Sequence, residues 1–404
     1  MKHSYCLSCN FLEIKFLFSL GSMPPVNAFI DKDEIEEAFP LDLYICPNCF
    51  LIQLGTIVPP EKLFSNYHHT SSASAGNVLH LKNVSELLNK KGLVNKRKIL
   101  EIGSNDGLLL YFLQAAGGEV LGVDPAKNLH SDTEKRGVNS LVGFFDENFA
   151  ESMLTSYSKF DTIVALNVMA HTPTFSSALK GVKKLLSKDG FFIMENAYVL
   201  DTVLEGQFDT IYHEHIFCFS LHALIYAYEI AGLAAIDAEI IPTQGTSIRI
   251  TVTHKKEGMK QSKNLIEILN REKKLGFKSI KKFEEAASKI IEFKSNLLKY
   301  LHTCAGEEVV GLGAPARGVV ILNYCQINSK NIQFIIDDTP LKQNKFVPGV
   351  NIPVKNWDSL DIKKHKKFII FSWNYAETFI QRLKSLGISG SVLIPFPNFS
   401  EIHI

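Results

Sequence analysis

The feature that most constrains the fold is an alternation of short apolar runs with turns and amphipathic stretches, which begins at residue 98. Runs of this length are typical of buried strands. The first set occupies residues 99–102, 120–123, 161–166 and 191–195, and a second set occupies residues 308–311, 334–336, 368–371 and 392–395. Strand–helix alternation of this kind builds a parallel sheet covered on both faces. We therefore expect two Rossmann-like α/β units in one chain.

Helices are expected outside these two sets of strands. One is expected over Ala75–Lys90, and long, mostly exposed helices over residues 255–300 should link the two units.

Composition excludes several classes of protein. The chain has 43 basic and 42 acidic residues, so its charge gives no reason to expect binding to nucleic acid or to an anionic membrane. The apolar run over residues 11–20 is short and contains Glu13 and Lys15, so it cannot span a bilayer. The N-terminus has no secretory signal pattern. We expect a cytoplasmic monomer. It should have two or three domains, because 404 residues are more than a single domain with one hydrophobic core usually contains.

Four of the seven cysteines form two Cys-x-x-Cys pairs, Cys6 with Cys9 and Cys46 with Cys49. Each pair can present two thiolates to one tetrahedral zinc ion, and four thiolates close the metal shell. Disulfides are not expected in a reducing compartment. The 36 residues between the pairs exceed the gap of small zinc ribbons, although a hairpin can fill it. The pattern predicts a structural zinc site; the alternative is two unrelated turns.

A glycine-rich turn follows the first predicted strand, in the sequence Glu101-Ile102-Gly103-Ser104-Asn105-Asp106-Gly107. Its acidic residues suit the cationic sulfonium and amino groups of S-adenosylmethionine better than a pyrophosphate. Asp124 ends the next strand, where a carboxylate can accept both ribose hydroxyls. A nicotinamide site and a merely structural turn are the alternatives. The predicted cofactor contacts are Glu101, Gly103, Asn105, Asp106, Gly107, Asp124, Phe145 and Asn167.

A second glycine turn, Gly311-Leu312-Gly313-Ala314-Pro315-Ala316, matches the dinucleotide fingerprint and is followed by Asp337 and Asp338. Alone it would favour NAD. Because so short a match is weak, we expect instead a degenerate Rossmann-like domain that forms one wall of the substrate cleft.

Ionisable and phenolic side chains gather after the later strands of the first unit. His171 follows the strand at residues 161–166, and Tyr212, His213, Glu214 and His215 stand nearly in succession. A histidine among apolar walls can act as a general base, and a tyrosine hydroxyl can stabilise an oxyanion. The alternatives are a solvated loop with packed rings and a metal site formed by His213 and His215.

Taken together, these motifs resemble the S-adenosylmethionine-dependent C-methyltransferases that act on nucleotide-linked 4-keto-deoxy sugars, of the tetronitrose and mycarose type. The resemblance covers essentially the whole chain. It includes the cysteine pairs, the segments 21–29 and 64–74, the turn at 101–107, residues 171–173, 208–215 and 245–249, and the segment 313–318.

The resemblance implies a zinc-binding domain (residues 1–72), a class I methyltransferase domain (73–250) and a C-terminal Rossmann-like domain with its helical linker (251–404). It implies that His215 is the base and that Tyr67, His171, Tyr212 and Glu214 lie beside a nucleotide-linked keto-sugar. His69, Thr246 and Arg317 depart from the family pattern, so the exact sugar stays open.

The function expected is methyl transfer to C3 of such a sugar through an enolate. The alternatives are an O- or N-methyltransferase, a non-catalytic protein that binds S-adenosylmethionine, and an NAD-dependent enzyme that uses the second glycine turn.

Overall fold

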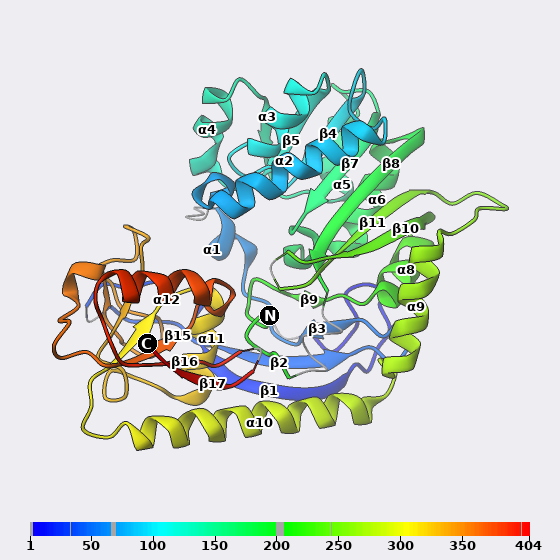
Figure 1. Cartoon of the computed structure of the whole chain (residues 1–404). Helices are drawn as coiled ribbons and strands as arrows, with labels where there is room; N and C mark the ends of the chain where they lie inside the picture. Colours follow the sequence, from blue (N-terminus) through cyan, green and yellow to red (C-terminus); the bar gives the residue numbers. More distant parts are fainter. Residues whose placement is uncertain (1–2, 33, 66–69, 199–205, 244, 397) are drawn as a thin grey trace.

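Three β-sheets organise the chain (Figure 1). The computed structural model describes residues 3–32, 34–65, 70–198, 206–243, 245–396 and 398–404. Within that part of the chain, no helix has both the length and the apolar character needed to cross a membrane.

The central sheet has seven strands in the order β10-β11-β8-β7-β4-β5-β6. They are β4 (Lys98–Ile102), β5 (Glu119–Asp124), β6 (Ser140–Val142), β7 (Phe160–Leu166), β8 (Leu186–Ala197), β10 (Leu233–Ile241) and β11 (Ser247–His254). The five strands from β4 to β8 are parallel, and β11 and β10 continue the sheet in antiparallel pairing. The parallel strands confirm the prediction, whereas the hairpin of β10 and β11 was not predicted.

Both faces of the central sheet are covered, as the alternation of apolar runs predicts. Along β4, Ile99 packs in one apolar cluster with Leu88 and Leu109, while Leu100 packs in another with Phe175 and Leu224. The helices are α2 (Ala75–Lys90), α3 (Leu108–Ala115), α4 (His130–Lys135), α5 (Glu147–Met153), α6 (Phe175–Leu185) and α8 (Leu221–Ile230). The helix predicted over Ala75–Lys90 coincides with α2.

The C-terminal sheet has six strands in the order β14-β13-β12-β15-β16-β17, of which only β17 is antiparallel to its neighbour. They are β12 (Val309–Leu312), β13 (Phe334–Ile336), β14 (Val354–Lys355), β15 (Lys367–Ile370), β16 (Ser391–Ile394) and β17 (Ser400–His403). The helices α11 (Ala316–Cys325) and α12 (Ala376–Ser385) pack with this sheet. This second Rossmann-like unit confirms the fold expected for the second set of apolar runs.

The N-terminal sheet consists of β1 (Lys15–Met23), β2 (Phe39–Ile45), β3 (Ile52–Leu54) and β9 (Phe217–Cys218). The strand β9 comes from far along the chain and pairs antiparallel with β3. A short helix, α1 (Pro60–Phe64), leads from this sheet toward the central unit (Figure 1). The linker helices α9 (Lys263–Leu275) and α10 (Ile280–Thr303) each bury one face, and α10 packs on β1 and α11.

Candidate active site and zinc centre

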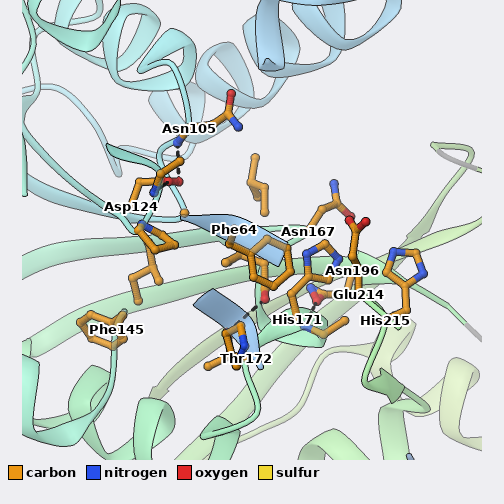
Figure 2. A pocket seen from close by; sticks show the side chains of 18 of the residues that line it. Phe64, Asn105, Asp124, Phe145, Asn167, His171, Thr172, Asn196, Glu214 and His215 are labelled. Atoms are coloured by element: carbon orange, nitrogen blue, oxygen red, sulfur yellow. Dashed lines mark hydrogen bonds between the residues drawn. The ribbon is translucent and has the colours of Figure 1, made fainter. Parts of the chain in front are cut away.

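One cavity of about 560 Å³ opens where the three parts of the chain meet. Asn27 and Phe64 line it from the N-terminal part, and Pro315 and Lys342 line it from the C-terminal part. The remaining wall is the edge of the central sheet at which the parallel strands end. Figure 2 shows Asn105 and Asp124 toward one end of this cavity and His171, Glu214 and His215 toward the other. The cavity therefore joins the predicted cofactor contacts to the predicted catalytic cluster.

Asp124 is held by backbone donors at the end of β5. Its two carboxylate oxygens each accept an N–H at 2.8 Å, one from Asn105 and one from Ala126. Each oxygen keeps further acceptor capacity, so the pair can accept two ribose hydroxyls. Burial raises the pKa of Asp124, and the two N–H donors oppose that shift.

The turn after β4 depends on backbone conformations with positive φ. Gly103 has a φ of 75°, and a Cβ there would lie 2.7 Å from the side chain of Val168. Asn105 has a φ of 49°, in the left-handed region that asparagine tolerates. Since the main chain of this turn lines the cavity, a ligand can approach it closely.

Glu101 provides the clearest test of whether a cationic cofactor fits. Its side chain lines the cavity and is 5% exposed, and Oε2 has no hydrogen-bond partner among the described residues. Burial raises the pKa of Glu101 well above its usual value, and the nearby carboxylates of Asp124 and Asp106 add to the shift. A buried carboxylate that keeps one oxygen without a partner favours a bound cation. The amino group and sulfonium of S-adenosylmethionine meet this requirement.

Asp106 and Gly107 lie behind the turn, outside the cavity wall. Asp106 pairs with Arg136 at 3.1 Å and accepts the N–H of Ser72. A Cβ at Gly107 would lie 2.9 Å from Val138, so this glycine permits close packing below the turn. In the structure, these two predicted contacts therefore support the turn from behind and do not line the cavity.

The predicted cofactor contact Phe145 lines the cavity, is 5% exposed and also belongs to the apolar core. Its neighbour Phe144 lines the same cavity and is 40% exposed. Asn167 follows β7 with a φ of 55° and lines the cavity between the two ends.

His215 is oriented by its own loop. Its Nδ1 lies 2.6 Å from the carbonyl oxygen of Thr210. Because a carbonyl oxygen can only accept, Nδ1 carries the proton and Nε2 keeps a free lone pair. Burial lowers the pKa of His215 to about 4; the Thr210 carbonyl opposes the shift, and the charge of Arg317 adds to it. The imidazole is thus neutral near pH 7, as a general base must be.

Aromatic rings surround this imidazole. The ring centroid of Tyr212 lies 3.9 Å from that of His215, and the ring of His171 lies 5.0 Å away. Phe64 of α1 stacks on His171, with centroids 5.7 Å apart and 9° between the planes. Burial lowers the pKa of His171 well below its usual value, and the neighbouring His215 contributes. Burial also raises the pKa of Tyr212, so its hydroxyl remains protonated and can donate.

Glu214 is held by the N-terminal part of the chain, because Asn27 Nδ2 donates to its Oε1 at 2.5 Å. His213 faces away from the cavity, and its Nε2 lies 3.1 Å from the carbonyl oxygen of Phe39. The predicted site residue Tyr67 lies outside the described residues, as does His69.

The four cysteines of the two pairs come together in one cluster. Their sulfur atoms lie within 4.8 Å of one another. Four thiolates about 2.3 Å from a common centre produce such spacings. The two turns are alike: Asn10 and Phe50 each have a φ of 60° and donate an N–H at 2.9 Å to the first cysteine carbonyl of their pair. The cluster fits a structural zinc ion.

No other group of three His, Cys, Asp or Glu side chains in the described part of the chain has a geometry suited to a metal ion. The metal site considered for His213 and His215 therefore has no support in the described residues, because the two side chains face different parts of the molecule.

The second glycine turn is closed by residues of its own domain. Asp337 Oδ2 accepts the N–H of Ala314 at 2.8 Å, and Lys342 donates to the carbonyl oxygen of Ala314 at 2.8 Å. A Cβ at Gly313 would lie 2.0 Å from Ser372 Oγ. Packing therefore accounts for the glycine without a dinucleotide.

Sequence reasoning assigned no role in the site to Asn27, Phe64 or Lys342. Asn27 and Phe64 fall in segments of the family resemblance, which was their only signal. No local pattern marks Lys342, because it reaches the cavity from a loop of the C-terminal domain.

Nearly the whole chain is similar to known proteins. Residues 242–397 match a family described as C-methyltransferase C-terminal domain, residues 6–64 match a zinc binding domain, and residues 75–238 match a methyltransferase domain. The chain is 30% identical over 401 residues to C-methyltransferase NovU of Streptomyces niveus, which covers 97% of this chain and 95% of that protein.

Two further similarities cover less than half of the chain. A ubiquinone biosynthesis O-methyltransferase of Glaesserella parasuis is 27% identical over 124 residues, which are 29% of this chain and 51% of that protein. The crystal structure of magnesium protoporphyrin IX methyltransferase from Synechocystis PCC 6803 with bound SAH aligns with a TM-score of 0.36 and 16% identity. That alignment covers 45% of this chain and 84% of the other.

Proposed function

This chain belongs to the S-adenosylmethionine-dependent C-methyltransferases that carry a zinc-binding domain, and on that premise we propose that it methylates C3 of a nucleotide-linked 4-keto-deoxy sugar. The observation that carries the proposal is the position of His215. His215 keeps a free lone pair on Nε2 and lines a cavity whose other end is lined by Asp124; Glu101 lines the same cavity. Methyl transfer to carbon needs such a base, because a C–H proton must be removed before the carbon is nucleophilic.

The cavity wall beyond His215 favours an anionic substrate. Pro315 and Ala316 mark the N-terminus of α11, and Lys342 lies beside them. The partial positive charge of a helix N-terminus and a lysine both suit the phosphate groups of a sugar nucleotide. This wall supports the choice of a nucleotide-linked substrate over an uncharged one.

The proposed chemistry begins with a ketone at C4, which acidifies the proton on C3. His215 Nε2 accepts that proton, and the electron pair of the broken C–H bond moves to the C4 oxygen as an enolate. The hydroxyl of Tyr212 or an N–H of His171 donates to this oxygen. S-Adenosylmethionine supplies the electrophilic methyl group, to which C3 forms the new bond as the carbon–sulfur pair leaves with sulfur. A positioned base contributes on the order of 10² to 10⁴ in rate.

The test is turnover of the His215→Asn variant with labelled S-adenosylmethionine and a panel of dTDP- and GDP-linked 4-keto sugars. We expect turnover to fall by about 10² to 10⁴ while S-adenosylmethionine binding, measured by calorimetry, is unchanged. The product of the wild-type enzyme should carry its new methyl group on C3 by NMR.

His222→Asn is the matched control, because His222 lies outside the cavity between Phe50 and Phe277. Near-normal turnover of His215→Asn would remove His215 from the role of base. A product methylated on oxygen or nitrogen would contradict the proposed reaction itself.

A further inference from the structure

The loop that presents His215 is anchored outside the methyltransferase unit. Phe208, at its beginning, is fully buried among aromatic rings of α10 and the C-terminal domain. Its ring centroid lies 5.4 Å from Phe293, 5.0 Å from Tyr324 and 6.0 Å from Phe396. The loop therefore packs on the C-terminal domain, although the strand before it, β8, belongs to the central sheet and the strand after it, β9, belongs to the N-terminal sheet.

The next residue, Asp209, is fully buried, and both of its carboxylate oxygens accept hydrogen bonds from the C-terminal domain. Arg317 of α11 donates from Nε and Nη2 to its two oxygens, both at 3.0 Å. Trp373 donates its indole N–H to Oδ2 at 2.8 Å. The guanidinium of Arg317 also stacks on the Trp373 ring, 4.4 Å from its centroid. This planar, bidentate arrangement has one geometry, which a lysine could not reproduce.

A short path connects this ion pair to the imidazole. Asp209 is bonded to Thr210, whose carbonyl oxygen orients His215 Nδ1. Any shift of Asp209 moves that carbonyl, and with it the direction of the Nε2 lone pair. Arg317 acts electrostatically as well, because its positive charge lowers the pKa of His215 and opposes the rise in the pKa of Tyr212. The other ionisable groups near His215 are His171, Tyr212 and Glu214, all of which line the same cavity.

We propose that Arg317 is a positioning residue for methyl transfer, which acts on His215 through Asp209 and Thr210. The inference rests on the proposed role of His215 as the base. It assigns the C-terminal domain a part in the chemical step in addition to forming a wall of the cavity.

The experiment compares Arg317→Gln with Arg317→Lys by kcat, KM and the pH profile of kcat/KM. Loss of the charge in Arg317→Gln should raise the pKa of His215, so the acid limb of the profile should move to higher pH. kcat should fall by about 10- to 100-fold, the range expected when a catalytic group is misplaced by about 1 Å. Arg317→Lys keeps the charge, so its acid limb should stay in place although kcat falls.

Two further variants separate this role from a loss of folding. Asp209→Asn/Arg317→Gln removes both charges together, so no unpaired charge is buried; it should fold and bind S-adenosylmethionine but keep the lowered kcat. Arg382→Gln breaks a comparable ion pair with Asp338 on the surface of the same domain and should leave kcat and the pH profile unchanged.

The inference is overturned if Arg317→Gln and the double variant both retain the wild-type kcat and acid limb. It is also overturned if Arg317→Gln and Arg317→Lys shift the limb equally. In either case His215→Asn, measured alongside, shows whether the proposed base fails as well: if that variant is inactive, only the role of Arg317 is lost.

Discussion

Glu101 and Asp124 lie on adjacent strands, but different hydrogen-bond donors surround their carboxylates. This difference determines what each carboxylate can bind. The oxygens of Asp124 each accept a backbone N–H, so its position is set before any ligand binds. Glu101 lies deeper, and its Oε2 has no partner among the described residues. The sequence predicted both acids as cofactor contacts. Only the hydrogen bonds show that Asp124 suits ribose hydroxyls, whereas Glu101 keeps an oxygen available for a cation.

This difference predicts that binding of S-adenosylmethionine is linked to pH. Because its pKa is raised, Glu101 in the free protein holds a proton up to a higher pH than an ordinary glutamate does, whereas a bound cation favours the ionised form. Binding should release that proton, so affinity should increase with pH until Glu101 is ionised in the free protein as well. Calorimetry in two buffers with different ionisation enthalpies measures the protons released.

Glu101→Gln should weaken binding by about 10- to 100-fold, as expected for a charge-assisted hydrogen bond of about 1.5–3 kcal/mol, and should abolish the release attributed to Glu101. Equal proton release by the variant and the wild type would show that another group carries the linkage.

At the scale of elements, the sheet next to the cysteine cluster is joined to the loop that carries His215, the proposed base. The strand β9 begins two residues after His215 and pairs with β3 through Ile52 with Cys218 and Gln53 with Phe217. The strand β3 in turn follows the second cysteine pair. A zinc ion bound by the four cysteines would therefore stabilise the sheet to which the end of the His215 loop is fixed.

Removal of zinc should accordingly impair catalysis as well as folding. We expect Cys46→Ser to lose zinc, to reduce the free energy of unfolding by more than about 4 kcal/mol and to lower turnover. Metal analysis, melting temperature and turnover are the measurements. Cys304→Ser, at a buried cysteine outside the cluster, should retain zinc and turnover. A zinc-free protein with full turnover would contradict the coupling.

At the scale of the whole molecule, the active cavity is a composite. Asn27 and Phe64 come from the N-terminal part, the cofactor turn comes from the central unit, and Pro315 and Lys342 come from the C-terminal domain. No single unit encloses it, and the linker helix α10 packs on both the N-terminal sheet and the C-terminal domain (Figure 1).

Hydrogen exchange should reveal this composite character. S-Adenosylhomocysteine alone should slow exchange at Asn105 and Ala126 in the central unit. Addition of a dTDP-linked 4-keto sugar should extend the protection to Phe64, His215 and Ala316. The helix α12, which lies outside the cavity, serves as the internal reference. Protection restricted to the central unit with both ligands present would contradict a substrate site shared by the three parts.

The sequence allowed much of the fold to be predicted because its signals are local. Buried parallel strands appear as apolar runs, so β4, β5, β7 and β8 and, in the C-terminal unit, β12, β13, β15 and β16 were found near their observed positions, whereas β14 and β17 were not predicted. The hairpin of β10 and β11 was not found, because antiparallel strands at a sheet edge lack such a continuous signal. The strand β9 has only two residues, too few for any periodicity.

By itself the sequence determined the chemistry that is available: four thiols in two knuckle-like turns, acids beside a glycine turn, and a cluster of histidine, tyrosine and glutamate. These properties depend on residue type and on spacing over a few positions. Only the tertiary structure decided that Asp106 supports the turn from behind while Glu101 lines the cavity, that His213 points away while His215 points in, and that Arg317 reaches Asp209. Such contacts join residues up to 174 positions apart, and they depend on how helices and sheets pack, which no local pattern in the chain records.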